Sequence, residues 1–107
     1  MAWTPVGQLN DCPPGRGLEA VAGDQLLAIF NVDGQLFALD GVCPHQGGPL
    51  ADGELTGCIV TCPWHGWQFD VRSGQHQLNR NFQQPRFDVK TEDGQIWVNL
   101  PDGEMPQ

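Results

Sequence analysis

Short segments, some of them apolar runs and others alternating between apolar and polar residues, follow one another along the chain, and glycine-containing pairs separate them. In the first half, residues 18–22 and 25–31 stand on either side of Gly23-Asp24. Asp33-Gly34 then leads into residues 35–39, and an Asp-Gly pair between two apolar runs is a strong signal for a β-hairpin. The pattern predicts a meander of antiparallel strands.

The second half repeats this arrangement of short strands and turns. The segments concerned are 58–61 and 67–70, followed by the turn Ser73-Gly74, and 86–90 and 95–100 on either side of Asp93-Gly94. No segment shows a sustained apolar period of 3.6 residues with helix caps, and the 14 glycines and 9 prolines suit a turn-rich fold. We expect one all-β domain over residues 1–107, with a loose tail at 101–107.

The length of the chain limits what it can contain. Its 107 residues suffice for one domain with a modest core and leave little room for a substrate pocket. No run approaches the roughly 20 apolar residues of a membrane span, and the first residues lack the features of a secretory signal. We therefore expect a cytoplasmic protein. The large aromatic residues that we expect in the core are Trp3, Phe30, Phe37, Phe87 and Trp97.

Acidic residues dominate the charge of the chain. The formal net charge is −8, and the segment 17–71 contains no Lys or Arg, so that all five basic residues lie outside it. Such a surface favours solubility, and it can also steer a protein toward basic docking faces. The sequence leaves both roles open. Nucleic acid is not expected as a partner, because binding to phosphates requires a basic patch.

Two cysteine–histidine pairs carry the candidate chemistry. One residue separates Cys43 from His45 and two separate Cys62 from His65, which gives the pattern Cys-x-His-x16-Cys-x-x-His. Thiolates and imidazoles are ligands of soft and borderline metals. The set can hold tetrahedral zinc, although structural zinc loops usually space their first two ligands more widely than Cys43 and His45. It also suits a [2Fe–2S] cluster with both thiolates on one iron and both imidazoles on the other.

The residues around both pairs resemble the two cluster loops of the Rieske family. The matching segments are Cys43-Pro-His-Gln-Gly-Gly-Pro-Leu50 and Cys62-Pro-Trp-His-Gly-Trp67. The resemblance implies stacked antiparallel sheets, in which a cluster-binding subdomain at about residues 39–70 is inserted in a larger β base. It also implies one [2Fe–2S] cluster per chain. In that arrangement Cys43 and Cys62 hold the inner iron, and His45 and His65 hold the outer iron near the surface.

The chain departs from the respiratory-chain members of that family at four positions. Gly48 and Trp64 stand where those members carry an additional pair of bridged cysteines, and Trp67 and Phe69 stand where they carry a serine and a tyrosine. Hydrogen bonds from such hydroxyls stabilise the reduced, more negative cluster, so their absence lowers the reduction potential. We therefore expect a low-potential Rieske ferredoxin.

Four residues near the motif are expected to support the cluster, and a fifth, His76, is expected to lie apart from it. We expect Trp64 and Trp67 to shield the cluster from water, with a partner-facing aromatic platform as the alternative. Gly47 and Gly66 suit tight backbone turns. His76 is not needed as a ligand and is expected to be exposed in a loop.

The two remaining cysteines, Cys12 and Cys58, can be explained in two ways. They can form a disulfide, or they can remain free thiols, which a reducing compartment favours. Cys58 lies in an apolar run, where an unpaired cysteine behaves as a small buried hydrophobic residue. We expect free thiols.

The resemblance implies an electron carrier that is not itself an enzyme. We expect a ferredoxin component that passes single electrons from a flavin-dependent reductase to a terminal oxygenase, recognised through basic docking faces, with no nucleic acid and no membrane involved. The small subunit of a nitrite reductase is similar in size and is the alternative. A zinc-stapled binding module without a redox role is the third hypothesis. The oligomeric state stays open, and a monomer is one of the options.

Overall fold

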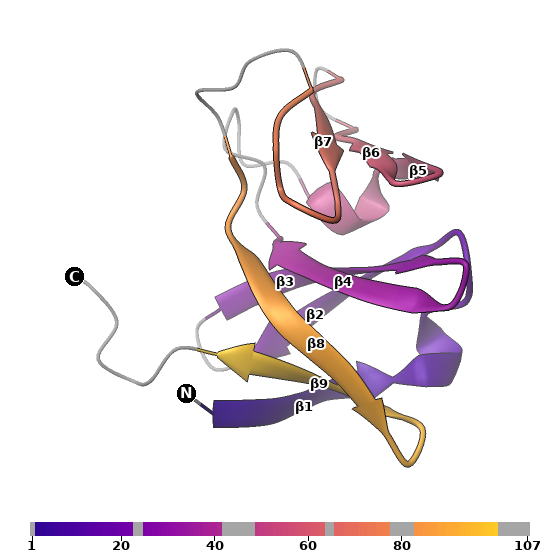
Figure 1. Cartoon of the computed structure of the whole chain (residues 1–107), viewed down its shortest axis with the longest axis vertical. Helices are drawn as coiled ribbons and strands as arrows, with labels where there is room; N and C mark the ends of the chain where they lie inside the picture. Colours follow the sequence, from indigo (N-terminus) through magenta and orange to yellow (C-terminus); the bar gives the residue numbers. More distant parts are fainter. Residues whose placement is uncertain (1, 23–24, 42–48, 64–65, 78–82, 101–107) are drawn as a thin grey trace, which may run out of the picture.

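Two antiparallel sheets make up the fold (Figure 1). The computed structural model describes residues 2–22, 25–41, 49–63, 66–77 and 83–100. The larger sheet has the strand order β1-β9-β8-β4-β3-β2, and the smaller sheet has the order β5-β6-β7. The strands are β1 (Ala2–Gln8), β2 (Gly17–Ala22), β3 (Gln25–Val32), β4 (Gln35–Asp40), β5 (Glu54–Thr56), β6 (Ile59–Thr61), β7 (Gln68–Asp70), β8 (Arg86–Glu92) and β9 (Gln95–Leu100).

Two short 3₁₀ turns complete the described elements: η1 (Leu9–Asp11) and η2 (Leu50–Asp52). The prediction of an all-β fold with stacked antiparallel sheets is confirmed. In the part of the chain that the structure describes, no helix has the length and apolar character to span a membrane.

The Asp-Gly pairs form the hairpin turns that the sequence predicts. Asp33 and Gly34 have φ angles of 53° and 94° between β3 and β4, and Asp93 and Gly94 have φ angles of 55° and 78° between β8 and β9. Two successive residues with positive φ are typical of the type I′ turn, whose twist matches that of the flanking strands. The pair Gly23-Asp24 lies outside the described residues.

Two strands were not predicted, and both lie at sheet edges. β1 contains Pro5, which cannot donate a ladder hydrogen bond, and its pairing with β9 shifts register between Pro5 and Gly7. Proline is tolerated at such edge positions and bulges. β5 is only three residues long and joins β6 through Gly57, whose φ is 61°. Neither strand is long or regular enough to show an alternating pattern in the sequence.

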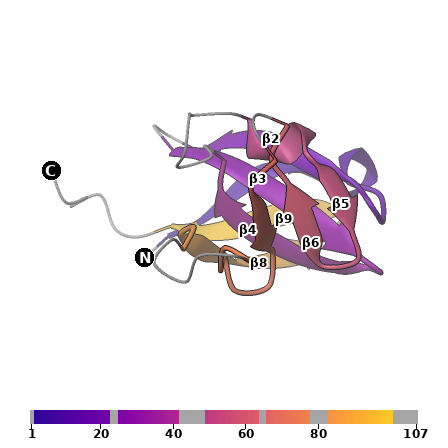
Figure 2. The same cartoon turned by 90° about the horizontal axis from the view of Figure 1, so that it is seen from above.

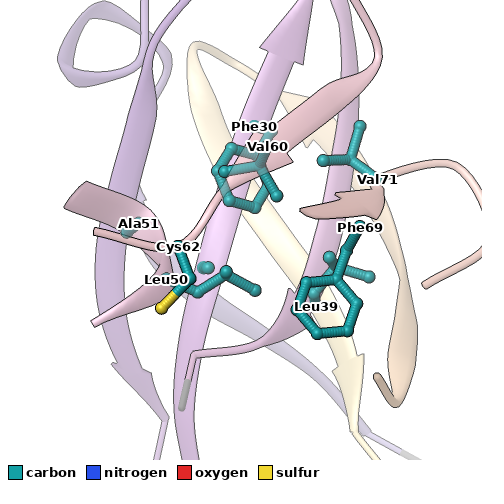
Figure 3. Close-up of a cluster of buried hydrophobic side chains, with 9 residues drawn as sticks. Phe30, Leu39, Leu50, Ala51, Val60, Cys62, Phe69 and Val71 are labelled. Atoms are coloured by element: carbon teal, nitrogen blue, oxygen red, sulfur yellow. The ribbon is translucent and has the colours of Figure 1, made fainter. Parts of the chain in front are cut away.

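The small sheet covers one face of the central strands β3 and β4, and Figure 2 shows β5 and β6 in front of the larger sheet. Side chains from both sheets meet in a core between the layers, which we call the inter-sheet core (Figure 3). Its buried members are Ala28, Phe30, Leu39, Leu50, Ala51, Val60, Cys62, Phe69 and Val71. β3 is buried on both faces, because Leu27 and Ile29 point the other way into a second core. Residues of β2, β3, β4 and β9 meet in this second core, which we call the base core.

Only some of the aromatic residues that we expect in the core are buried there. Phe30 is fully buried, and Phe37 and Phe87 are half-buried against the inter-sheet core and the base core, respectively. Trp97 is also half-buried. The prediction for Trp3 is wrong, because 41% of this residue is exposed. Its ring lies under the ammonium group of Lys90, 4.6 Å from the ring centroid, in a cation–π contact at the surface.

Candidate metal centre

Cys62 is the predicted ligand that lies among the described residues. It directly follows β6, and only 1% of its surface is exposed. Its side chain belongs to the inter-sheet core, and Figure 3 shows it beside Leu50, at one end of that core. The other three predicted ligands, Cys43, His45 and His65, lie outside the described residues. This explains why no group of three or more His, Cys, Asp or Glu side chains converges within the described ranges.

The second motif loop leaves and rejoins the small sheet through a hydrogen-bonded base. The backbone N–H of Cys62 donates to the carbonyl of Trp67 over 2.7 Å, and the N–H of Gly66 donates to the carbonyl of Cys62 over 3.2 Å. The first bond continues the β6–β7 ladder, in which Thr61 is paired with Gln68. Gly66 has a φ of 75°, so the predicted tight turn is confirmed there. Gly47 lies outside the described residues.

The first motif loop is tied at its base as well. The N–H of Leu50 donates to the carbonyl of Gly41 over 3.0 Å, and the N–H of Gly41 donates to the carbonyl of Leu26 over 2.9 Å. A Cβ atom at Gly41 would lie 3.0 Å from the carbonyl carbon of Leu27, so the chain passes close to β3 and a larger residue would have to displace its neighbours. Since Leu50 and Cys62 share one core, the sheets bring the bases of the two loops together.

The chemistry of this position fits an iron–sulfur cluster. Two ferric ions, two sulfides and two thiolates carry no net charge when the histidines are neutral. A neutral group beside apolar side chains such as Leu50 and Phe69 avoids the large desolvation penalty of a buried charge. A buried cysteine at the boundary of that core is therefore well placed to be a cluster ligand.

The two residues that we expect in place of hydroxyl donors lie on β7 and directly before it. Phe69 is fully buried on β7, and Trp67 is half-buried, with 6.4 Å between the centroids of the two rings. Trp67 packs against the inter-sheet core, as expected for a residue that excludes water. Neither side chain carries a hydroxyl group. Trp64, the other expected shielding residue, lies outside the described residues.

The structure corrects the prediction for His76. This residue is 6% exposed, and its imidazole meets Trp67 and Phe69 edge to face, with centroid distances of 4.6 and 5.2 Å. Burial lowers the pKa of His76 below its usual value, so the neutral imidazole is favoured at neutral pH. His76 therefore packs in one aromatic group with Trp67 and Phe69.

The turn after β7 explains why the exposed-loop prediction for His76 fails. The N–H of Asp70 donates to the carbonyl of Gln75, and the N–H of Gln77 donates to the carbonyl of Gln68. These bonds fold the chain back along β7, and His76 pairs with Phe69 as an isolated bridge. Because side chains alternate between the faces of a strand, His76 points inward between two glutamines. This alternation after the turn is the signal that could have revealed it.

An arginine–carboxylate pair fixes the same turn. Arg72 donates to both carboxylate oxygens of Asp70, with Nη2–Oδ2 and Nε–Oδ1 distances of 2.7 and 3.0 Å. The hydrogen bond from the guanidinium group holds the pKa of Asp70 below its usual value. Arg86 donates from Nη1 to the carbonyl of Arg72 over 2.6 Å, which connects the turn to the first residue of β8.

The two cysteines outside the motif are not bridged to each other, so the prediction of free thiols is confirmed. Cys12 is buried in the base core, where its Sγ donates to the carbonyls of Arg16 and Ile29. Burial raises the pKa of the Cys12 thiol. Cys58 is half-buried against the inter-sheet core. The two residues therefore belong to different cores.

Comparison with known families and sequences gives consistent matches. The Rieske [2Fe-2S] domain matches residues 2–96 of this chain. The biphenyl dioxygenase ferredoxin subunit of Pseudomonas sp. (strain KKS102) is 38% identical over 76 residues, which is 70% of each chain. The anthranilate 1,2-dioxygenase ferredoxin subunit of Burkholderia cepacia is 28% identical over 99 residues, which is 92% of each chain.

Solved structures with the same fold include further ferredoxins. The Sphingomonas yanoikuyae B1 ferredoxin superposes with a TM-score of 0.85 at 28% identity, covering 94% of this chain and 100% of that chain. A chain in the complex of reduced oxygenase and oxidized ferredoxin in carbazole 1,9a-dioxygenase gives a TM-score of 0.80 at 28% identity, covering 90% of this chain and 91% of that chain. The small subunit of an NADPH nitrite reductase gives a TM-score of 0.81 at 20% identity, covering 94% and 100%, and this likeness shows the fold alone.

Proposed function

The chain belongs to the Rieske [2Fe-2S] domain family, and we propose that it is the ferredoxin component of an oxygenase system. It carries a [2Fe–2S] cluster and moves single electrons between partner proteins, without being an enzyme itself. The observation that carries this proposal is the length of the match. Ferredoxin subunits align with this chain over up to 92% of both sequences, so the match covers nearly all of this chain and of those relatives.

We propose that Cys43 and Cys62 hold one iron and that His45 and His65 hold the other. The buried position of Cys62, next to the base of the first loop, supports this assignment. The cluster supplies reversible one-electron chemistry when it is bound. The cluster-binding part of the domain is the segment from about residue 39 to about residue 70, which includes both loop bases and the small sheet.

The surroundings of Cys62 favour a low reduction potential. Hydroxyl donors to the cluster sulfurs or to a cysteine ligand would stabilise the reduced state. Phe69 and Trp67 provide apolar surface in these places. The net charge of −8 acts in the same direction, because negative charge disfavours the addition of an electron.

The partners that we propose are a flavin-dependent reductase and a terminal oxygenase. The structure of the carbazole 1,9a-dioxygenase ferredoxin bound to its oxygenase supports the second of these. Exposed carboxylates on this chain include Asp52, the last residue of η2, and Glu54, the first residue of β5. They suit partners with a basic docking face, whose attraction weakens as salt increases. We place the protein in the cytoplasm, where such reductases and oxygenases meet.

The experiment that tests this function follows electrons into and out of the holoprotein. We expect the reduced protein to be reoxidised by the terminal component of a biphenyl-type dioxygenase within single-turnover times, at a rate that falls as ionic strength rises. A nitrite reductase large subunit is the comparison acceptor. Rapid reoxidation by that acceptor, with none by the oxygenase, would assign the chain to the nitrite reductase class.

A further inference from the structure

Gln84 is a buried polar residue between the two sheets. It is 2% exposed and lies two residues before β8. Its side-chain Nε2 donates to the carbonyl of Asp40 over 2.7 Å, and its backbone N–H donates to the carbonyl of Gly74 over 2.7 Å. One residue of the connecting segment is therefore bonded to both halves of the molecule.

The two acceptors lie next to the two cluster loops. Asp40 is the last residue of β4 and precedes Gly41, whose carbonyl closes the base of the first loop. Gly74 lies in the turn after β7, and its N–H donates to the carbonyl of Asp70 over 2.7 Å. β7 in turn pairs with β6, which leads into Cys62. Gln84 thus links the start of the first loop to the sheet that carries the second.

The main chain of Gln84 packs closely against Gly74 in the turn after β7. Gly74 has a φ of 81°, and a Cβ atom there would lie 2.1 Å from the carbonyl oxygen of Gln84. Neighbouring residues add parallel links on both sides. The N–H of Asp40 donates to the carbonyl of Pro85 over 2.8 Å, and Nε2 of Gln83 donates to the carbonyl of Ser73 over 2.9 Å. The segment 83–86 therefore acts as a strap across the two sheets.

We propose that Gln84 is a positioning residue for the cluster, and that its hydrogen bonds to Asp40 and Gly74 set the spacing between the bases of the cluster loops. This inference rests on the proposed function, because it assumes that one cluster takes ligands from both loops. Four ligands from two separate loops keep their geometry only if the loops keep their distance. A buried amide that loses its partner is costly, so the strap resists opening.

Asn31 offers a matched control for ordinary structural stabilisation. It is 3% exposed, and its Nδ2 donates to the carbonyl of Cys12 over 2.8 Å, while its Oδ1 accepts from the N–H of Gly34. Like Gln84 it is a buried amide bonded to a main-chain carbonyl. Its partners are Cys12, which directly follows η1, and Gly34 in the β3–β4 hairpin, away from the described bases of both cluster loops.

The test compares Gln84→Met and Asn31→Leu in the purified holoprotein. Both variants should unfold at lower temperature. Only Gln84→Met should bleach faster when a chelator is added well below the unfolding temperature, by about tenfold, which corresponds to about 1.4 kcal/mol. Its reduced form should also show shifted or broadened EPR lines, and its reduction potential should move. Gln84→Asn, which keeps an amide but shortens its reach, should fall between the wild type and Gln84→Met and serves if Gln84→Met does not fold.

Equal bleaching rates, EPR lines and potentials in the Gln84 and Asn31 variants would overturn the positioning role. That outcome leaves the ferredoxin function intact, because the wild-type protein would still hold its cluster and reduce its oxygenase. A wild-type protein without iron and sulfide would instead refute the proposed function itself.

Discussion

Phe69→Tyr tests what sets the reduction potential of this protein. Phe69 is fully buried on β7, the strand that follows the second motif loop. From the resemblance of the motif, we expect it to stand where high-potential Rieske proteins carry a tyrosine. The substitution adds one hydroxyl group and keeps the shape of the ring. If that hydroxyl donates to a cysteine ligand, the reduced cluster becomes more stable and the potential rises.

The expected magnitude follows from the strength of such a bond. A hydrogen bond to a charged acceptor contributes about 1.5–3 kcal/mol, and only the difference between the two oxidation states changes the potential. If about half of the bond energy differs between them, the effect is about 0.7–1.5 kcal/mol. Since about 59 mV corresponds to a tenfold change for one electron, we expect a rise of about 30–65 mV. Because the site is buried, a hydroxyl without an acceptor would instead lower the free energy of unfolding by about 1–3 kcal/mol.

Voltammetry on the wild type and two variants decides the matter. Phe30→Tyr is the control, because Phe30 is equally buried in the inter-sheet core but lies on β3 of the larger sheet. We expect a positive shift for Phe69→Tyr and none for Phe30→Tyr. Equal shifts in both variants would show that the effect is not local. An unchanged potential in a Phe69→Tyr protein of unchanged stability would show that hydroxyl donors do not set the potential.

Two further predictions concern histidines. His65→Cys should either abolish the cluster or lower its reduction potential, because a thiolate adds negative charge. Iron content measures the loss of the cluster, and voltammetry measures the potential. A raised potential would contradict the ligand assignment. His76 has a pKa lowered by burial, so the unfolded chain, whose histidine titrates near pH 6.5, binds the proton first as pH falls. The free energy of unfolding of the wild type should therefore fall from about pH 6.5 downward. The His76→Phe variant should lose less stability over the same pH range and should keep the visible spectrum. A bleached His76→Phe protein would mean that His76 is a ligand.

Much of the fold follows from local signals in the sequence. The Asp-Gly pairs at 33–34 and 93–94 predict two hairpins, because few residues other than Asp, Asn and Gly accept positive φ at both turn positions. The alternating segment 95–100 matches β9. β1 cannot be predicted in this way, because Pro5 and a register shift interrupt its pattern. Its partner strand, β9, also lies at the other end of the chain.

The sequence predicts a ligand set but not the residues that pack beneath it. Spacing alone marks Cys62 as a candidate ligand, since metal ligands impose fixed residue types at short intervals. The structure shows that Cys62 is buried, and its role as a ligand stays a prediction. His76 and Gln84 are buried by tertiary contacts. Strand alternation after the turn at 73–74 is the one local signal for His76, and no local pattern encodes the burial of Gln84. Both are polar residues in glutamine-rich stretches and are typical of exposed loops on composition. The prediction for Trp3 is wrong in the opposite sense, since a residue expected in the core is exposed. A surface cation–π contact with Lys90 accommodates its ring outside the core.

The metal and sulfide content of anaerobically purified protein tests the central claim most directly. We expect about two irons and two labile sulfides per chain, with visible absorption, and a rhombic EPR signal from mixed thiolate and imidazole ligation after reduction. One zinc per chain, without visible absorption and without labile sulfide, would contradict the account and would identify a zinc-stapled module in place of an electron carrier.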